Sequence, residues 1–369
     1  MQFTSLMPLR VVAYTDAAGV GGAEISLGHL VAAVGASVEI TVVGEHTDVV
    51  DAIASRHPKA RSQIVGQSFF AHRRMFQQLR PQVIHCNLCT PWAGAIGLAA
   101  ALSLPDMRVV RVDQLPLRTT DAVQLWRTRA LSLRVDAHVA VGQASARRME
   151  DFYALGRHSV LSIPNGVPDA IAPSPPIAQP DRMLVVGSVG RLDRMKAHDV
   201  LIQAIAQVKN LRVVIVGEGS ERSALEQLAN DLGVSDRVEL RGWSDDPRSL
   251  LAEFDIFTLP SRSEGFPLAI VEAMLAARPV VATRVGSVSE AVTDGTGLLV
   301  EKDDVDGLAA ALQQLCDRPD LRLHMGNMAR QIAQTHFTSD RMADAYLKLW
   351  QTICARSPAP RLRVPRPRD

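Results

Sequence analysis

Short apolar runs rich in β-branched residues recur through the first half of the chain, with helical segments between them. The runs are continuous rather than alternating, as in strands of a parallel sheet whose two faces are both covered by helices. This pattern predicts a doubly wound α/β domain. Its expected strands lie at 10–14, 38–43, 83–86, 109–112, 137–141 and 160–163.

The same alternation starts again in the second half, after a segment without periodicity. Residues 169–180 include four prolines, which interrupt both helices and strand ladders. We therefore expect a Pro-rich linker at 169–182 between an N-terminal domain, 1–168, and a C-terminal domain, 183–338. The strands expected in the second domain lie at 183–189, 211–216, 238–240, 256–259, 280–282 and 298–300.

The C-terminal end carries its own amphipathic helix. Within 339–355, apolar side chains recur on one face, so the helix should dock on a core, and the N-terminal domain is the candidate. These side chains are Met342, Tyr346, Leu349, Trp350 and Ile353. The segment 356–369 is rich in Pro and Arg, and we expect it to form a disordered basic tail.

The composition is that of a folded, globular chain. Of 369 residues, 47% are hydrophobic and 21% are charged, which argues against the fibrous and disordered classes. The formal net charge is only +1, and the basic tail accounts for the positive sign. A general nucleic-acid-binding surface is therefore not expected.

The cysteines predict neither a disulfide framework nor a metal site. Four cysteines in a chain of this length favour a reduced, cytoplasmic setting. Cys86 and Cys89 form a C-x-x-C pair, but zinc requires a second pair at similar spacing, so no metal is expected.

Residues 1–10 lack the basic start and apolar run of a secretory signal. The apolar stretch 91–105 is shorter than the roughly 18 residues of a membrane span and predicts a buried helix.

A glycine-rich loop follows the first expected strand and precedes a helix that begins near Ala23. It contains Gly19, Gly21 and Gly22. Paired glycines let the backbone pass close to a ligand, and the helix N-terminus beyond them offers N–H groups to an anion. Tight strand-to-helix turns use glycine as well, so both a phosphate contact and a purely structural turn remain open.

The second domain opens in a parallel way. Gly190, Arg191 and Lys196 follow its first strand and precede a helix. Ligands bind at the carboxyl ends of the strands in open α/β sheets. There, the planar guanidinium of Arg191 could bind a pyrophosphate with two parallel hydrogen bonds, and Lys196 could bind it as a point charge. The alternative is a pair of solvated loop cations.

Two glutamates lie near the start of a helix expected at 267–277, where Pro267 suits the first turn. Glu272 projects from the apolar stripe of this helix and needs a partner, because an unpaired buried carboxylate costs several kcal/mol. Ribose hydroxyls are one candidate, and an ion pair with Arg278 or Arg284 is the other. Glu264 lies beside Gly265, which permits close backbone approach, and could accept hydroxyls of a sugar.

Four motifs together carry a resemblance to glycosyltransferase family 4, the group 1 glycosyltransferases of the GT-B fold. They are Glu264 and Glu272 with seven residues between them, the Gly190-Arg191-Leu loop to Lys196, Gly21-Gly22-Ala-Glu24, and Ile163-Pro-Asn-Gly-Val167. The resemblance implies two Rossmann-like domains facing across a cleft. It also implies a nucleotide-diphosphate sugar held mainly by the C-terminal domain, an acceptor site on the N-terminal domain, retention of anomeric configuration, and neither metal nor cofactor.

The family roles can be carried over residue by residue. Arg191 and Lys196 would hold the diphosphate, Glu272 the ribose and Glu264 the transferred sugar, so that Arg191, Lys196 and Glu264 are the candidate catalytic residues. Segments around Gly217 and Gly242-Trp243 would flank the base. The candidate donor-binding residues are Gly21, Gly22, Gly190, Arg191, Lys196, Gly242, Glu264, Gly265, Phe266, Pro267 and Glu272.

The chain departs from the family pattern at three places. The family often has a His near the sugar after the strand at 109–112, where this chain has Asp113 and Gln114. Either Asp113 or Gln114 would have to serve in its place. Separately, His85 ends the strand at 83–86 and either faces the cleft or is structural. Ala197 replaces the usual Gly after the Lys, and Ala277-Arg278-Pro279 lacks the usual Gly before Pro. Because Ala197 is small, we expect that replacement to be harmless.

The resemblance implies a retaining hexosyltransferase acting in cell-surface polysaccharide or glycolipid synthesis. A UDP-sugar is favoured as donor and a GDP-sugar is the alternative, with a sugar or a lipid-linked molecule as acceptor. Two rivals are a nucleotide-sugar epimerase of the same fold, which would need an acid/base set on the sugar ring, and a non-catalytic sugar-nucleotide binder. The sequence offers no persuasive acid/base set.

The segment 118–134 mixes basic and apolar residues. It could form an interfacial helix on an anionic membrane, or simply a solvated helix face. We therefore expect a cytoplasmic protein, with peripheral attachment to the inner face of the membrane left open. The residues concerned are Arg118, Arg127, Arg129 and Arg134 against Asp121, with Val123, Leu125, Trp126, Leu131 and Leu133 among them.

Overall fold

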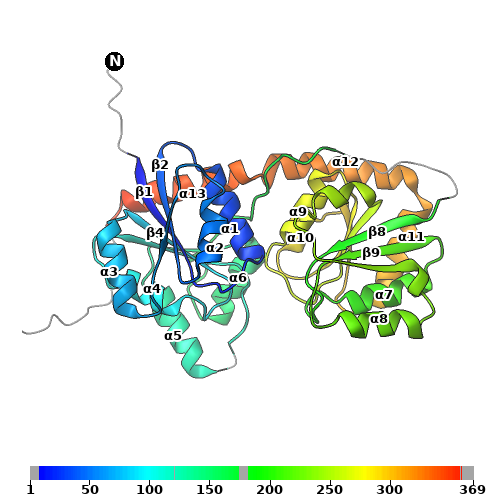
Figure 1. Ribbon diagram of the computed structural model, residues 1–369, viewed down its shortest axis with the longest axis horizontal. Coiled ribbons are helices and arrows are strands. Elements are labelled where there is room, and N and C mark those ends of the chain that lie inside the picture. The colour runs from blue at the N-terminus through cyan, green and yellow to red at the C-terminus, as the bar shows by residue number, and fades with distance from the viewer. Residues whose placement is uncertain (1–7, 120, 174–181, 358, 360–369) are drawn as a thin grey trace, which may run out of the picture. The chain divides into compact units, whose positions relative to one another are not determined.

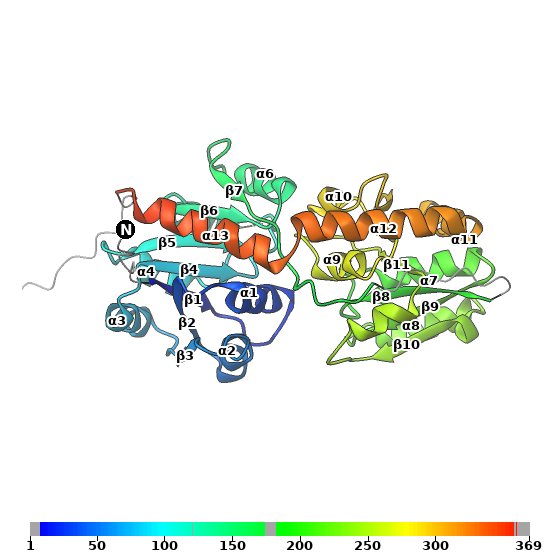
Figure 2. The same ribbon diagram turned by 90° about the horizontal axis from the view of Figure 1, so that it is seen from above.

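The computed structural model describes residues 8–119, 121–173, 182–357 and 359. The chain divides into two compact units (Figures 1 and 2). The first comprises 1–166 with 339–369, and the second comprises 167–338. Most of the expected linker at 169–182 and most of the expected tail at 356–369 lie outside the described residues.

The first unit is built on a seven-stranded parallel sheet in the order β3-β2-β1-β4-β5-β6-β7. Its strands are β1 (Leu9–Thr15), β2 (Val38–Gly44), β3 (Arg61–Ile64), β4 (Val83–Leu88), β5 (Arg108–Asp113), β6 (Ala137–Ala140) and β7 (Val160–Ser162). Its helices are α1 (Gly22–Ala33), α2 (Thr47–Ala54), α3 (Phe69–Leu79), α4 (Ala95–Leu102), α5 (Ala122–Ser132), α6 (Gln143–Phe152) and α13 (Ser339–Cys354).

Helices cover both faces of this sheet, which explains the continuous apolar runs. Along β1, Val11 and Ala13 join one core with α1, α2 and α13. Val12 and Tyr14 join a second core with α3 and α4 on the other face. Successive strand side chains face opposite sides, so each must be apolar when both sides are covered.

The helix α13 packs on the first unit, as its apolar stripe predicts. It follows directly after α12 in the chain (Figure 2). Tyr346, Trp350 and Ile353 are buried in the core shared with α1. The chain therefore returns to the first unit at Ser339, after completing the second.

The second unit has a six-stranded parallel sheet in the order β10-β9-β8-β11-β12-β13. Its strands are β8 (Leu184–Val189), β9 (Leu211–Val216), β10 (Val238–Gly242), β11 (Ile256–Leu259), β12 (Val280–Thr283) and β13 (Gly297–Val300). Its α-helices are α7 (His198–Gln207), α8 (Arg222–Asp231), α9 (Leu268–Leu275), α10 (Val288–Ala291), α11 (Val305–Asp317) and α12 (Pro319–His336). In the first unit β1 lies between β2 and β4, and in the second unit β8 lies between β9 and β11. The strand order therefore changes direction at β1 and at β8, and the loops after these two strands lie at a switch point.

The predicted fold class of two doubly wound parallel sheets is therefore confirmed. The edge strand β3 was missed, because all four of its residues are exposed and it has no apolar run. The apolar stretch 91–105 contains the helix α4, as predicted. Among the described residues, no helix has both the length and the apolar character needed to cross a membrane.

Candidate functional site

The loop after β8 is shaped by the carboxylate of Asp193. Its Oδ1 accepts hydrogen bonds from the backbone N–H groups of Met195 and Lys196, both at 3.0 Å. Its Oδ2 lies 3.1 Å from Nη2 of Arg191, whose side chain is 70% exposed. This surface ion pair is weak, so the Arg191 guanidinium can turn to a ligand at little cost.

Lys196 and Glu264 form an ion pair between the loops that follow β8 and β11. Nζ of Lys196 lies 2.6 Å from Oε1 of Glu264. The same Oε1 accepts a hydrogen bond of 2.7 Å from Oγ of Ser261. Glu264 is only 8% exposed, so these two donors offset the cost of removing its carboxylate from water.

Glycines allow the backbone of this site to pack closely. Gly286 has a φ of +55°, and a Cβ there would lie 2.0 Å from the carbonyl oxygen of Glu264. Gly217 has a φ of +145°, and a Cβ there would lie 2.0 Å from the carbonyl oxygen of Gly190. The N–H of Gly217 also donates to the carbonyl of Gly242 at 2.8 Å. Any side chain at Gly217 or Gly286 would separate these strand-end loops.

The two alanines that replace family glycines both adopt left-handed backbone conformations. Ala197 has a φ of +54° and Ala277 has a φ of +59°. A residue with a Cβ pays roughly 1–2 kcal/mol in this region. The expectation that Ala197 is harmless is thus corrected: its small size fits a buried position, but its backbone is strained.

Glu272 lies on α9 with 9% of its surface exposed. Its Oε1 accepts a hydrogen bond of 2.9 Å from Nε of Arg248. The alternative of an ion pair with an Arg is thus present, but the Arg is not one of the two examples expected: Arg278 donates to the carbonyl of Ala252, and Arg284 lies against Glu301. Arg248 stands on the irregular segment before a 3-10 helix, where no sequence pattern links it to α9.

The remaining donor-side candidates divide into buried and exposed positions. Phe266 is buried and packs on Phe337 with ring centroids 5.0 Å apart, so its side chain belongs to the core. Pro267 is the residue before the first turn of α9 rather than part of it. Gly242 has a φ of +88°, and Trp243 after it is exposed with Nε1 donating to Asp245 at 2.9 Å.

The glycine loop of the first unit is held by Glu24. Its Oε2 accepts a 3.1 Å hydrogen bond from the N–H of Gly21, and its Oε1 lies 3.4 Å from Oγ1 of Thr15. Burial raises the pKa of this carboxyl. None of Gly19, Gly21 and Gly22 has a left-handed φ, and a Cβ at Gly19 or Gly22 would meet nothing within 4 Å. The turn itself therefore does not require glycine at these positions.

Asp113 and His85, two of the residues expected near the sugar, are buried inside the first unit. Asp113 is bound by Nε and Nη2 of Arg111 at 2.7 and 2.9 Å and by Nε2 of His138 at 2.8 Å. Burial alone would raise the pKa of Asp113, but Arg111 and His138 overcome it and lower the pKa to about 2. The expectation that Asp113 stands in for the family His is corrected, because its carboxylate is enclosed by an internal ion pair.

His85 lies against α13 rather than at the surface. Its ring meets Tyr346 and Trp350 edge-on, with centroids 4.9 and 5.7 Å apart. Burial lowers the pKa of His85 to about 3, so the ring is neutral at physiological pH. Of the two interpretations left open by the sequence, this geometry favours the structural one.

Gln114 is the residue of this group that remains partly exposed, and a chain of hydrogen bonds fixes its amide. Its Nε2 donates to Oδ1 of Asn87 at 2.8 Å, and its Oε1 accepts from Nδ2 of Asn165 at 2.9 Å. Ser26 of α1 donates to Oδ1 of Asn165 at 2.7 Å. Sequence reasoning missed Asn87 and Ser26. A signal for Asn87 was available, because it is a polar residue at the carboxyl end of a buried strand.

Comparison with known proteins gives the family. A model of "Glycosyltransferase Family 4" matches residues 20–170, and a model of "Glycosyl transferases group 1" matches residues 184–318. Together these ranges span well over half of the chain. The chain belongs to the group 1, family 4 glycosyltransferases, as its motifs predicted.

The curated relatives are similar over part of their length. The lipopolysaccharide core biosynthesis glycosyltransferase LpsE of Rhizobium meliloti is 36% identical over 166 residues, which cover 45% of this chain and 49% of that protein. A D-inositol 3-phosphate glycosyltransferase of Corynebacterium jeikeium is 37% identical over 189 residues, covering 47% and 45%. The chain thus spans about half the length of the curated relatives it matches.

Solved structures share the fold over nearly the whole chain. A crystal structure of Anabaena Alr3699/HepE in complex with UDP has a TM-score of 0.81 at 21% identity, covering 93% of this chain and 100% of that one. The lipopolysaccharide outer core galactosyltransferase WaaB has a TM-score of 0.73 at 16% identity, covering 93% and 99%. At this level of identity the likeness establishes the GT-B fold alone.

Proposed function

We propose that this protein is a retaining, metal-independent glycosyltransferase that moves a hexose from a nucleotide-diphosphate sugar to a sugar or a lipid-linked acceptor. The observation that carries the proposal is the Lys196–Glu264 ion pair at the carboxyl ends of β8 and β11, with Arg191 in the same loop as Lys196. Ligands of open α/β sheets bind at this edge. A diphosphate needs cations and a sugar needs hydroxyl acceptors, and these loops supply both side by side.

The charge of the leaving group is the main demand of the reaction. When the bond between the anomeric carbon and the phosphate oxygen breaks, the electron pair stays with the diphosphate. Arg191, Lys196 and the N-terminus of α7 can stabilise this charge without a divalent ion. The acceptor oxygen would then bond to the anomeric carbon on the face that the diphosphate leaves, and the proton of the acceptor hydroxyl would pass to the departing phosphate oxygen. Attack on this face retains the configuration.

The two glutamates fit donor-binding roles rather than that of a nucleophile. The contacts of Glu264 with Lys196 and Ser261 both involve Oε1, so Oε2 can accept a hydroxyl of the sugar. Arg248 holds Glu272 by a hydrogen bond to its Oε1. The remaining lone pairs of the Glu272 carboxylate can accept hydrogen bonds from the two ribose hydroxyls. Trp243 is an exposed aromatic surface beside Gly242 that suits a base.

For the first unit taken by itself, we propose a phosphate contact at Gly21 and Gly22. The turn does not need these glycines, so close approach of a ligand to the backbone is the better explanation for them. Gln114 would then face the sugar or the acceptor. Its amide can bind a hydroxyl but cannot exchange a proton near neutral pH, which agrees with attack that uses no protein base.

The donor is proposed to be a UDP-sugar, with a GDP-sugar as the alternative. The Anabaena structures hold UDP and UDP-glucose, whereas a relative from Corynebacterium glutamicum is described as a GDP-mannose-dependent mannosyltransferase. Relatives described as acting in lipopolysaccharide core biosynthesis support a glycolipid or polysaccharide product.

We also propose peripheral contact with an anionic membrane through α5. Val123 and Trp126 on this helix are 71% and 72% exposed, beside the exposed Arg127 and Arg129. Exposed apolar side chains next to arginines suit the boundary between lipid headgroups and acyl chains. A lipid-linked acceptor would be presented at that boundary.

The experiment is incubation with UDP-, GDP- and ADP-sugars in the presence of EDTA, with and without acceptor sugars or lipid extracts. Release of the nucleoside diphosphate that depends on an acceptor supports the transferase. Conversion of the donor into an epimer without release would support an epimerase instead. Donor binding without turnover in every combination would support a non-catalytic binder.

A further inference from the structure

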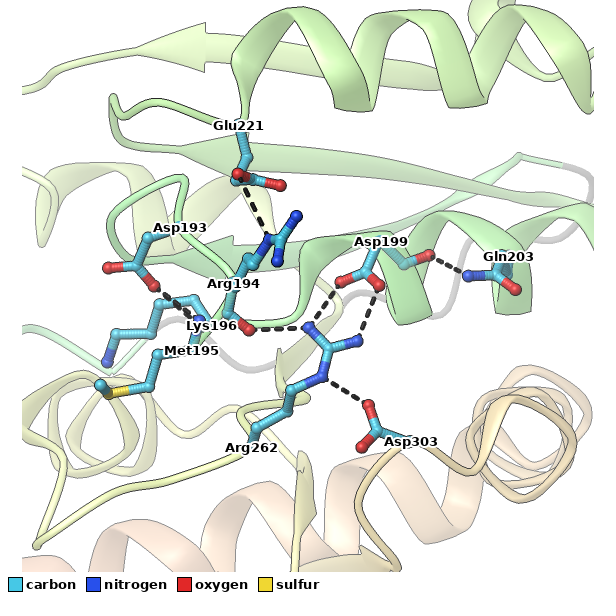
Figure 3. A network of polar contacts seen from close by, with 9 residues as sticks. All are labelled: Asp193, Arg194, Met195, Lys196, Asp199, Gln203, Glu221, Arg262 and Asp303. Carbon is cyan, nitrogen blue, oxygen red and sulfur yellow. Dashed lines mark hydrogen bonds and ion pairs between the residues drawn. The ribbon is translucent and has the colours of Figure 1, made fainter. Parts of the chain in front are cut away.

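The loop that carries Glu264 is tied to the loop that carries Lys196 by a second, separate set of contacts made by Arg262 (Figure 3). The Arg262 guanidinium forms a fork on the Asp199 carboxylate, with Nη1 to Oδ1 at 3.1 Å and Nη2 to Oδ2 at 2.7 Å. Nη1 also donates to the carbonyl of Arg194 at 2.7 Å. The backbone N–H of Arg262 donates to the carbonyl of Met195 at 2.8 Å.

The same side chain reaches a third segment. Nε of Arg262 lies 2.5 Å from Oδ1 of Asp303, in the turn after β13. Asp303 has a left-handed backbone, with a φ of +62°. Arg262 lies in the loop after β11. Its guanidinium therefore connects this loop to three other segments, which are the loop after β8, the first turn of α7 and the turn after β13.

We propose that Arg262 is a positioning residue for sugar transfer. It fixes the loop that carries Arg191 and Lys196 relative to the loop that carries Glu264. One donor can then contact the first loop with its diphosphate and the second loop with its sugar. This inference rests on the proposed function. Arg262 itself points to Asp199 and Asp303 and acts through the loops it joins (Figure 3).

The contacts of Arg262 matter for the geometry of the loops more than for the stability of the fold. Arg262 is 31% exposed and its partners more so, so its ion pairs contribute little to the free energy of unfolding. Even so, Arg262 fixes two backbone carbonyls, that of Arg194 through its side chain and that of Met195 through its backbone N–H. Lys196 is the next residue in the chain. Small displacements of reacting groups cost rate even where the fold is intact. A lysine cannot replace the fork, because a single ammonium does not bind a carboxylate and a carbonyl in one plane.

The test compares Arg262→Ala and Arg262→Lys with a matched control, Arg237→Ala. Arg237 also joins two segments of the second unit, through the carbonyls of Val208 and Leu211, but at the amino-terminal edge of the sheet. Three quantities are measured: kcat, the KM for the donor, and hydrogen exchange of the N–H groups of Met195 and Lys196. Melting temperatures verify that each variant is folded.

We expect both Arg262 variants to lose about tenfold to a hundredfold in kcat, with a smaller change in KM and faster exchange at Met195 and Lys196. Arg237→Ala should change neither kcat nor this exchange. A kcat within threefold of the parent in Arg262→Ala would overturn the inference and leave the proposed function standing. A lower kcat with unchanged exchange would also overturn it, because the effect would not pass through the loop.

The failure of the proposed function would look different. If the parent protein turned over no donor, the transferase assignment would fail, and hydrogen exchange alone would decide the role of Arg262. Faster exchange in Arg262→Ala than in Arg237→Ala would still support the link between the loops. Equal exchange in the two variants would overturn it.

Discussion

Nζ of Lys196 lies 2.6 Å from Oε1 of Glu264, although 68 positions separate the two residues in the chain. In the proposed function, one loop would supply a cation for a diphosphate, and the other would supply a carboxylate for a sugar. Because the two groups are already paired, a phosphate that drew Lys196 away would weaken the contact of Lys196 with Glu264. In the proposed function, the pair would link recognition of the diphosphate with recognition of the sugar.

Glu264→Gln should separate binding of the nucleoside diphosphate from turnover of the whole donor. The amide keeps the shape but removes the charge that competes for Lys196, so a nucleoside diphosphate should bind as tightly as before or more tightly. Turnover of the whole donor should fall, because the sugar loses its charged acceptor. Calorimetric titration with the nucleoside diphosphate, together with steady-state kinetics, measures both. Parallel loss of nucleotide affinity and turnover would contradict this division of roles.

Glu272 and its partner Arg248 should respond differently to substitution. Glu272→Ala should greatly weaken donor binding, because it removes the proposed ribose acceptor. Arg248→Ala should keep more of the donor affinity but lower the stability, since it leaves a nearly buried carboxylate without its cation. Donor titrations and thermal melts on both variants test this contrast. Equal donor affinity in Glu272→Ala and the parent would rule out the ribose assignment.

Buried histidines should make the protein sensitive to acid. Burial lowers the pKa of His85 to about 3 and that of His198 to about 4, with the charge of Lys196 adding to the second shift. Between about pH 6.5 and pH 4 the unfolded chain binds protons at these rings while the folded chain does not, so the free energy of unfolding falls as the pH falls through this range. For His85 alone the loss between pH 6.5 and 5 is about 2 kcal/mol.

His85→Phe should therefore reduce the pH dependence of unfolding while keeping the ring contacts with Tyr346 and Trp350. Urea titrations at pH 7 and pH 5, followed by fluorescence of the buried Trp350, measure the difference. An unchanged pH dependence in the variant would mean that His85 is protonated in the folded protein.

The proposed membrane contact predicts flotation with anionic liposomes at low salt. Replacing Val123 and Trp126 by Ser should reduce it, because these side chains supply the apolar part of the contact. Ile64→Ser, an exposed apolar residue on β3 in the same unit, is the matched control and should float like the parent. Absence of flotation by the parent protein would dispose of the contact.

The sequence predicts the layered fold well because burial on both faces leaves a strong apolar signal in each central strand. It misses β3, which is exposed and identified only by its pairing with β2. Within the site, motif spacing points to Glu264 and Lys196, but not to the pair they form. Arg248 and Arg262 escape notice for a similar reason, because ion pairs between loops depend on the folded geometry and leave no period in the sequence.

The polar residues near Gln114 show the opposite error. Asp113 follows an apolar strand and reads as a candidate for chemistry, yet Arg111 and His138 enclose it. Arg111 lies within the strand itself, and His138 comes from β6. Neither the burial of Asp113 nor its partners can be seen from the order of residues alone.

Above all, we propose that Arg191 and Lys196 stabilise the diphosphate as it leaves. The most direct measurement is the rate of nucleoside-diphosphate release in EDTA, at saturating donor and acceptor, by the parent, Arg191→Ala, Lys196→Ala and the double variant. Each single replacement should lower turnover by about a hundredfold, or on the order of 3 kcal/mol, and the double variant should lose less than the product of the two. Turnover and donor affinity both within about threefold of the parent in each single variant, under roughly 1 kcal/mol, would contradict the account.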